Sequence, residues 1–364
     1  MLLRFFRIVR KNLQALVKIW GAIVFISIYF YSLPVANGEN MERNKILRDL
    51  ANMSQKKEWK VLSGGDWSDT DFEEKITIVT FDGRIMTARP KFLEKRPGWK
   101  IRGKWLSCAG SKIAFWWTNL GVIEPPAVYS ELYVMDVDGS NLKKICDVSV
   151  GNFISWSPTG DKIAFTKFLG HTEGTQIPRR SGSLLVIDLR TNKISTIIDS
   201  GVFDITSQAW SPDGRKIVFT TVESREGIER ADEIRIIDVN QKTIKTIGTG
   251  WQATWSPDGH WIAYQRHGLG DYYIFNPKND AQDLLIKNKA SLTGALIRRR
   301  GPVVGPLIWS PDSHYLLYER TIPFIDAEGN WPHIMHLESK REVKLPTPTL
   351  SDISPAGSWG GRTQ

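Results

Sequence analysis

The residues that could act as metal ligands or catalytic groups are few. Only His171 and His267, in two predicted loops, could meet, and no carboxylate partner is evident for them. His333 and His336 stand three positions apart in a predicted strand, where side chains alternate between faces, so they point to opposite sides. His260 and His314 occupy the same position in two copies of a repeat, which reflects repetition rather than convergence on one site. Because the chain also has no Gly-x-Ser-x-Gly nucleophile elbow, we predict no catalytic residue, no cofactor and no metal.

Arginine is the residue type whose placement indicates binding. Seven arginines fall in long, irregular segments between predicted strands, which is where binding surfaces usually lie. A guanidinium group forms paired, charge-assisted hydrogen bonds with carboxylate or sulfate groups. The sequence therefore predicts a partner-binding loop face at Arg179, Arg180, Arg225, Arg230, Arg298, Arg299 and Arg300. The alternative interpretation, solvated loop charge, stays open at this point.

The overall charge excludes nucleic acid as a partner. The 364-residue chain has 48 Lys plus Arg against 39 Asp plus Glu, a formal net charge of +9. Residues 1–38 hold five of the basic residues and no acidic one, which leaves 43 against 39, or +4, for the remainder. Nucleic-acid binding needs a concentrated basic surface. A body this close to neutrality does not provide one.

The N-terminus has the pattern of an export signal. Basic residues precede an uncharged run at 19–36, which predicts a signal peptide or signal anchor over 1–38. Ala36 and Gly38 fit a cleavage before Glu39, and membrane contact is expected only through 19–36 if the segment stays uncleaved. The body is expected to be extracytoplasmic, periplasmic or secreted. Residues 39–75 are predicted as a spacer, with a short helix near 46–53 and then an acidic stretch.

One pattern recurs through the rest of the chain and uses many of its 15 Trp residues. Trp156-Ser-Pro-Thr-Gly-Asp-Lys-Ile-Ala-Phe165 returns at 210, 255 and 309, and degenerate copies stand at 106 and 353. The copies are 44–54 residues apart. The residues predicted to carry the repeat are Trp156, Pro158, Gly160, Trp210, Pro212, Asp213, Gly214, Trp255, Pro257, Asp258, Gly259, Trp309, Pro311 and Asp312.

Each repeat reads as four short antiparallel strands, a to d. Ser-Pro-Asp-Gly is a turn that joins strand a, ending at Trp, to strand b. A second apolar run, such as Ile234-Arg-Ile-Ile-Asp238, predicts strand c, and a polar turn leads to strand d. A four-stranded sheet cannot bury both faces alone, but radial packing of several sheets buries them in a β-propeller. We expect the Trp rings to lie between neighbouring sheets.

Two further motifs are assigned to this framework. Asp136-x-Asp138-Gly-Ser-Asn141 imitates the start of a calcium loop but lacks the Glu at position 12, so we predict a hairpin turn. Cys108 falls in an a–b turn and Cys146 in strand d of the same repeat. Three strand spacings exceed the reach of a disulfide, so two free thiols are predicted.

The Trp-Ser-Pro-Asp-Gly-x-x-Ile-Ala-Phe signature resembles the TolB-like (WD40-like) propeller repeat, over about residues 76–359. The resemblance implies an all-β, six-bladed propeller in 76–364. Its ring would be closed by N-terminal strands c and d (76–88) pairing with C-terminal strands a and b (349–362); five or seven blades remain alternatives. Residues 39–75 are too short for the α/β domain that precedes the TolB propeller, so we expect a TolB-like chain rather than TolB.

The resemblance implies a non-enzymatic interaction module of the cell envelope. We expect a monomeric propeller that binds an envelope protein or lipoprotein, with an acidic segment as the contact, through its long-loop face and central channel. The alternative is a carbohydrate-active propeller enzyme, a polysaccharide lyase or glycoside hydrolase that acts on an anionic glycan. A cluster of carboxylates or histidines at the channel mouth would favour the enzyme.

Overall fold

The computed structural model describes residues 60–62, 76–80, 85–90, 96, 99–107, 110–119, 130–148, 151–171, 180–199, 204–223, 231–266, 271–287, 307–310, 312–320 and 331–344. Every element within these residues is a β-strand, which confirms the all-β prediction. In this described part, no helix is long and apolar enough to cross a membrane. The predicted signal segment and the helix near 46–53 lie outside the described residues.

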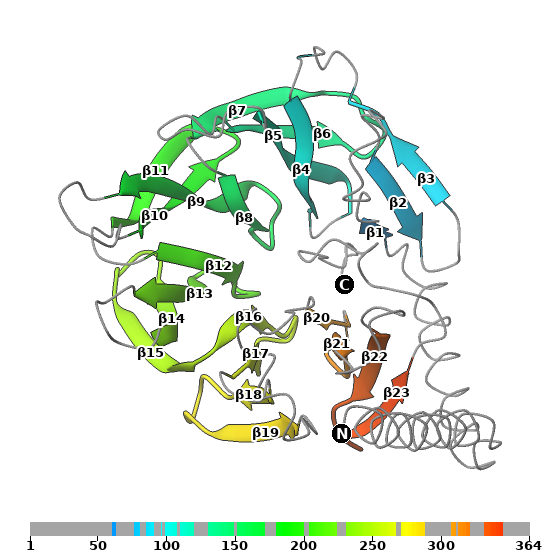
Figure 1. Ribbon diagram of the computed structural model, residues 1–364, viewed down its shortest axis with the longest axis vertical. Coiled ribbons are helices and arrows are strands. Elements are labelled where there is room, and N and C mark those ends of the chain that lie inside the picture. Colours follow the sequence, from blue (N-terminus) through cyan, green and yellow to red (C-terminus); the bar gives the residue numbers. More distant parts are fainter. Residues whose placement is uncertain are drawn as a thin grey trace, which may run out of the picture. The chain divides into compact units, whose positions relative to one another are not determined.

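The strands form five four-stranded antiparallel sheets and one three-stranded sheet (Figure 1). The first sheet holds β1 (Lys60–Leu62), β2 (Ile76–Thr80) and β3 (Ile85–Ala88). The second holds β4 (Trp99–Leu106), β5 (Lys112–Asn119), β6 (Ser130–Asp136) and β7 (Lys143–Val148). The third holds β8 (Gly151–Trp156), β9 (Lys162–His171), β10 (Arg180–Asp188) and β11 (Lys193–Asp199).

The remaining three sheets repeat this order. The fourth holds β12 (Asp204–Trp210), β13 (Lys216–Glu223), β14 (Ala231–Asp238) and β15 (Ile244–Thr249). The fifth holds β16 (Trp251–Trp255), β17 (Ile262–Gln265), β18 (Tyr272–Phe275) and β19 (Gln282–Ile286). The sixth holds β20 (Ile308–Trp309), β21 (Tyr315–Arg320), β22 (Trp331–His336) and β23 (Arg341–Lys344). In every four-stranded sheet, strands adjacent in sequence are hydrogen-bonded neighbours, as predicted for a to d.

The serine of the repeat holds the a–b turn together. In the fourth sheet the buried Ser211 hydroxyl accepts the Lys216 N–H at 2.9 Å and donates to the Asp213 carboxylate at 2.5 Å. Asp213 in turn accepts the Arg215 N–H at 3.1 Å. Gly214 has a φ of 68°, a conformation that favours glycine. The corresponding serines of the other four-stranded sheets accept the same backbone bond: Ser107, Ser157, Ser256 and Ser310.

Replacing Ser211 by Ala tests this turn. The change leaves the Lys216 N–H without its acceptor, the buried Ser211 hydroxyl, so the free energy of unfolding is expected to fall by about 1–2 kcal/mol in urea denaturation. Ser195, which is exposed on β11, is the matched control, and its Ala variant is expected to stay within about 0.5 kcal/mol. Equal losses at both positions would contradict the role given to the turn serine.

The tryptophans lie between successive sheets, as predicted. Trp156 at the end of β8 packs in one buried cluster with Trp105 of the second sheet and Phe165 of the third. Its indole Nε1–H donates to the Trp105 backbone oxygen at 3.1 Å. The other three repeat tryptophans pack with residues of the preceding sheet in the same way: Trp210, Trp255 and Trp309. The first strands also contact one another in order, β4 with β8, β8 with β12, β12 with β16 and β16 with β20.

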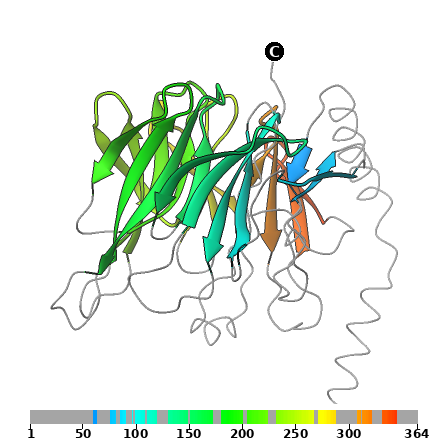
Figure 2. The same ribbon diagram turned by 90° about the horizontal axis from the view of Figure 1, so that it is seen from above.

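The short turns share one end of the strands. Turns a–b and c–d of the green sheets gather at the same side in Figure 2. We call this side the turn end, and the opposite side, where strand b leads to strand c, the connection end.

The first sheet corrects the predicted ring closure. The strand that pairs with β2 is β1 (Lys60–Leu62), with Val61 opposite Val79. The prediction had given this place to a C-terminal strand and had left Lys60–Leu62 in the 39–75 spacer. The reason is that Lys60-Val61-Leu62 carries the Lys-Ile-Ala pattern of a b strand, although no Ser-Pro-Asp-Gly turn precedes it. The C-terminal residues 345–364 lie outside the described residues.

Candidate functional site

Buried polar side chains form a layer at the connection end of the second to fifth sheets. Strand b is apolar from its start up to an aromatic residue, such as Phe165 or Phe219, and becomes polar beyond it although it is still buried. Strand c shows the reverse order. The layer consists of Thr118, Ser130, Glu131, Thr166, Ser183, Thr220, Thr221, Asp232 and Gln265. Sequence analysis did not identify this layer, because burial of polar residues is decided by the packing of neighbouring sheets.

Side chains of the layer form hydrogen bonds with a neighbouring strand of the same sheet. The Thr118 and Ser130 hydroxyls are 3.0 Å apart across β5 and β6. The Ser207 hydroxyl of β12 donates to Thr220 of β13 at 2.9 Å. Buried hydroxyl groups need such partners, since an unpaired one costs about 1–3 kcal/mol. Thr118, Ser130 and Thr220 are thus buried hydroxyl residues that have a partner at the connection end of their sheets.

The first strands are irregular in the same half. Their pairing with the second strand shifts register in four successive sheets, which is the signature of a β-bulge. Bulges redirect side chains and are common beside binding and active sites. The shifts lie between Arg102 and Lys104, Gly151 and Ile154, Ile205 and Ser207, and Trp251 and Thr254.

Glu131 is the centre of the most developed ionic cluster in the layer. Its carboxylate is 6% exposed and accepts hydrogen bonds from Arg96 Nη1 at 2.9 Å, Lys144 Nζ at 2.9 Å and the Tyr133 hydroxyl at 3.1 Å. Lys144 also pairs with Asp147 at 2.8 Å. Two cations and two carboxylates thus balance one another.

The electrostatics hold Glu131 and Lys144 in their charged forms. Burial alone raises the pKa of Glu131, but hydrogen bonds from Lys144, Arg96 and Tyr133 outweigh it and lower the pKa below its ordinary value. The hydrogen bonds with Asp147 and Glu131 raise the pKa of Lys144 to about 12. A carboxylate that stays ionised and saturated with donors is suited to fixing strands β6 and β7 and the Arg96 segment, rather than to transferring protons.

The lowered pKa of Glu131 predicts a pH dependence of stability. The pKa of Glu131 is lower in the folded than in the unfolded protein. The stability that Glu131 contributes is therefore fully present above the unfolded pKa of about 4.3 and is lost as the pH falls through the folded pKa. Glu131→Gln is therefore expected to be less stable than the parent at neutral pH and to lose less stability between about pH 5 and pH 3. Urea midpoints at each pH measure this. Asp280→Asn, at an exposed ion pair with Lys245, is the control.

The structure places one of the predicted arginines. Arg180 begins β10 opposite His171, the last residue of β9, and so its backbone lies at the connection end. The prediction had placed Arg180 in a loop, whereas it is the first residue of a strand, and its role in binding stays a prediction. The other six, Arg179, Arg225, Arg230, Arg298, Arg299 and Arg300, lie outside the described residues, and their role stays a prediction.

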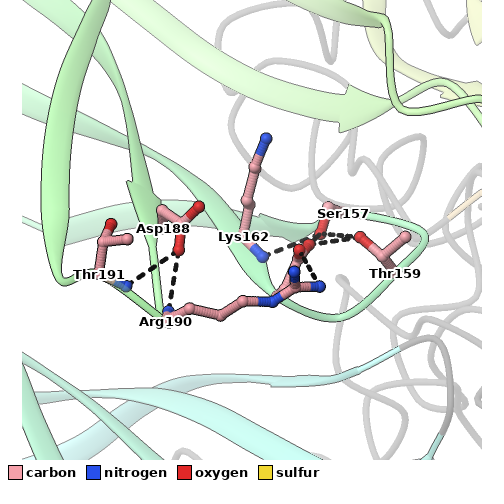
Figure 3. A network of polar contacts seen from close by, with 7 residues as sticks. Ser157, Thr159, Lys162, Asp188, Arg190 and Thr191 are labelled. Carbon is pink, nitrogen blue, oxygen red and sulfur yellow. Dashed lines mark hydrogen bonds and ion pairs between the residues drawn. The ribbon is translucent and has the colours of Figure 1, made fainter.

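At the turn end of the third sheet, polar side chains pair with one another and with the backbone of the turns. In Figure 3 Asp188 accepts the backbone N–H groups of Arg190 and Thr191 at 2.9 and 3.1 Å. The Arg190 guanidinium pairs with Asp161 at 2.6 Å, and the Ser157 hydroxyl donates to the same carboxylate at 3.1 Å. The acidic groups here are used to build turns and to neutralise neighbouring cations.

The repeat histidines have partners of the same kind. His260 Nδ1 lies 3.0 Å from Asp258 Oδ2, and His314 Nδ1 lies 3.6 Å from Asp312 Oδ2. In both turns the Asp also accepts the backbone N–H of the His. The equivalence follows from the repeat, as the sequence indicated.

The two histidines of β22 have separate surroundings. His333 is buried, stacks on Tyr318 and lies 3.4 Å from Glu342 Oε1. His336 is at the end of the strand, where its Nδ1 accepts the Ser339 N–H at 3.3 Å. Within the described residues, no group of three or more His, Cys, Asp or Glu side chains is arranged to hold a metal ion.

The calcium-like segment is a hairpin turn, as predicted. Asn141 Nδ2 donates to Asp136 at 2.6 Å, and the Ser140 N–H donates to Asp138 at 2.8 Å. Lys112 occupies the other oxygen of Asp136, also at 2.6 Å. The carboxylates are directed into the turn itself.

Cys146 is a free thiol on β7, in agreement with the prediction; Cys108 lies outside the described residues. Burial raises the pKa of the Cys146 thiol to about 12. In a Cys108→Ser chain, iodoacetamide labelling at about pH 8 is therefore expected to be at least about a hundredfold slower in the folded than in the denatured protein, because the thiolate is the reacting form. Mass spectrometry measures the labelling, and equal rates in the folded and the denatured protein would contradict this burial.

Solved structures resemble the chain, whereas no protein-family model and no curated protein matches it. TolB from Acinetobacter baumannii superimposes with a TM-score of 0.56 at 18% identity, covering 83% of this chain and 66% of TolB, just under two thirds. The nidogen/laminin complex gives 0.52 at 12%, covering 81% and 95%. Oligogalacturonate lyase from Vibrio parahaemolyticus gives 0.51 at 13%, covering 81% and 82%. At such identities the likeness establishes the fold alone.

Proposed function

On the premise of this TolB-like β-propeller fold, we propose that the chain is a non-enzymatic, extracytoplasmic module that binds a protein partner through the connection end of its sheets. The observation that carries the proposal is the asymmetry between the two ends. The turn end is short, repetitive and internally paired, whereas the connection end combines a buried polar layer with bulged first strands. Irregular ends of a regular scaffold are where binding residues collect.

The chemistry of the partner follows from the arginines. Arg180 starts β10 at the connection end. In the sequence three more arginines fall between strands b and c of the third or the fourth sheet, Arg179, Arg225 and Arg230, and three fall between the fifth and sixth sheets, Arg298, Arg299 and Arg300. We propose a carboxylate-bearing segment of an envelope protein or lipoprotein as the ligand. The export signal predicted in 1–38 supports this setting. The nidogen/laminin structure, a complex of two proteins, supports protein binding as a use of the same fold.

Site-specific photo-cross-linking tests which end binds. A photoreactive amino acid replaces Lys167, which is exposed on β9 beyond Phe165, or Arg190, which is exposed in a turn of the same sheet. After illumination in intact cells, cross-links to one envelope protein are expected from position 167 and not from position 190. Cross-links from 190 alone would place the interface at the turn end and overturn the proposal.

A carbohydrate-active enzyme is the second candidate, because a lyase shares the fold. A lyase would cleave an anionic polysaccharide and leave unsaturated sugar ends, which absorb ultraviolet light. The module that we propose is expected to give no such signal and no shortened chains with polyuronates or sulfated glycans. Product formation by the purified chain would favour the enzyme.

A further inference from the structure

Residues 190–196 and 240–246 occupy the same place in the third and fourth sheets. Each segment belongs to the c–d turn and the first half of strand d, which is β11 in one sheet and β15 in the other, and both strands are sheet edges (Figure 1). Every residue of both segments is exposed. The segments are in contact, since Lys242 Nζ donates to the Thr196 backbone oxygen at 3.2 Å. Together they form one surface at the turn end, which we call the rim patch.

The rim patch has a surplus of positive charge. It holds four basic residues and no acidic one: Arg190, Lys193, Lys242 and Lys245. Acidic residues beside it neutralise part of this charge, as Asp161 does for Arg190 and Asp280 for Lys245. Over all turn-end residues of the two sheets (157–162, 188–196, 211–216 and 238–246), seven Lys plus Arg stand against four Asp, or +3. The same turns of the fifth sheet (256–261 and 276–284) have one Lys and three Asp, or −2.

Two large hydrophobic side chains are exposed among these basic residues. Ile194 is 43% exposed and Ile244 is 48% exposed, at equivalent positions of their strands. Ile194 follows Lys193, and Ile244 stands between Lys242 and Lys245 in the sequence. Among the described residues, the other large hydrophobic side chain exposed to this degree is Leu284, in the acidic turn end of the fifth sheet. Exposed isoleucine together with surplus positive charge therefore distinguishes the rim patch.

We propose that the rim patch binds the surface of a bilayer that contains anionic phospholipid. The lysines and the arginine lie at the level of the phosphate groups, and the two isoleucines insert into the boundary between the headgroups and the acyl chains. A soluble polyanion would engage the basic residues and leave the isoleucines in water, whereas a bilayer accepts both. The sequence had predicted membrane contact through 19–36 alone, so this contact is an additional one.

The rim patch and the proposed partner face lie at opposite ends of the same sheets. A chain that is bound to a bilayer through the rim patch keeps its connection end open to a protein. The membrane contact does not depend on the protein partner, so vesicles alone can test it.

Fluorescence quenching by labelled lipid tests the contact. The full chain with Cys108→Ser and Cys146→Ser receives one new cysteine, either Thr243→Cys in the rim patch or Lys167→Cys at the connection end, and a fluorophore is attached to it. The vesicles consist of phosphatidylcholine, with or without an equal part of phosphatidylglycerol, and carry a quencher on the upper acyl chain. Quenching is expected at position 243 with the anionic vesicles only, and at position 167 with neither. Because quenching reports where the label lies, insertion of the segment 19–36 does not imitate this result.

Substitutions in the chain labelled at position 243 separate charge from insertion. Changing Lys193, Lys242 and Lys245 to Gln is expected to lower the affinity for anionic vesicles by about a hundredfold, since each basic residue near an anionic surface accounts for roughly fivefold. Changing Ile194 and Ile244 to Ser is expected to lower it by about tenfold or more. Leu284→Ser is the matched control and should leave the affinity unchanged. Circular dichroism and urea midpoints verify that each variant is folded.

Three results would overturn the proposal. The first is no quenching at position 243 with anionic vesicles, or equal quenching at position 167. The second is an unchanged affinity after both isoleucines are replaced, which would show that the basic residues bind a polyanion without insertion. The third is a photoreactive residue at position 243 that captures a protein and no lipid in intact cells, which would assign the rim patch to a protein partner.

Discussion

Replacing Trp156 by Ala is expected to lower the free energy of unfolding by about 3–5 kcal/mol. The Trp156 ring is 4% exposed and fills the space between the second and third sheets, against Trp105 and Phe165. Removing it leaves a cavity that two rigid sheets cannot close. Urea denaturation followed by circular dichroism measures the loss; a decrease below about 1 kcal/mol would contradict the packing.

Phe substitutions separate the hydrogen bond of this residue from its packing. Trp156 Nε1–H donates to the Trp105 backbone oxygen, whereas Trp210 Nε1 has no hydrogen-bond partner among the described residues. Both rings are buried between sheets. Trp156→Phe is therefore expected to cost more than Trp210→Phe, by about 1 kcal/mol. Equal costs would show that the indole N–H of Trp156 contributes nothing.

The repeat made most of the fold predictable from sequence because its chemistry is local. Ser211, Asp213 and Gly214 satisfy one another within a single turn, so the same few residues produce the same hairpin wherever they recur. A strand whose position depends on pairing with a neighbouring strand, and not on a local motif, is harder to predict from the sequence. Lys60–Leu62 is three residues long and lacks the turn before it, and its place is set by pairing with β2.

For the proposed binding site, the sequence could indicate only which end of the sheets to consider. Long connections in the sequence predict a binding face at the connection end, where the Arg180 backbone begins β10; whether this end binds stays a prediction. The Glu131 cluster was not foreseen, because Arg96 and Lys144 are 35 and 13 residues away in sequence. Lys144 meets Glu131 only when β6 and β7 pair, and Arg96 reaches it from the segment before β4. A glutamate beside the first apolar residue of a c strand was the one local signal, and it does not distinguish a buried carboxylate from an exposed one.

The second large effect concerns binding. Changing Arg298, Arg299 and Arg300 together to Ala is expected to weaken capture of the cross-linked partner on the order of a hundredfold, since the loss of two charge-assisted pairs accounts for about 3 kcal/mol or more. Three adjacent guanidinium groups repel one another, so removing them should change the free energy of unfolding by less than about 1 kcal/mol. Quantitative pull-down and urea denaturation of the same variant measure the two effects separately.

Salt and a Lys variant distinguish how the arginines act. If their charge attracts the partner, the difference in affinity between the parent and the triple Ala variant should shrink as the salt concentration rises. Salt screens exposed charges, with a screening length of about 10 Å at 0.1 M. If paired hydrogen bonds matter as well, the triple Lys variant, which keeps the charge and loses the planar fork, should bind between the two. Capture that survives the Ala change at low salt would show that these three residues are solvated surface. The interface would then have to lie over the buried polar layer itself, where cross-linking from position 167 would still detect it.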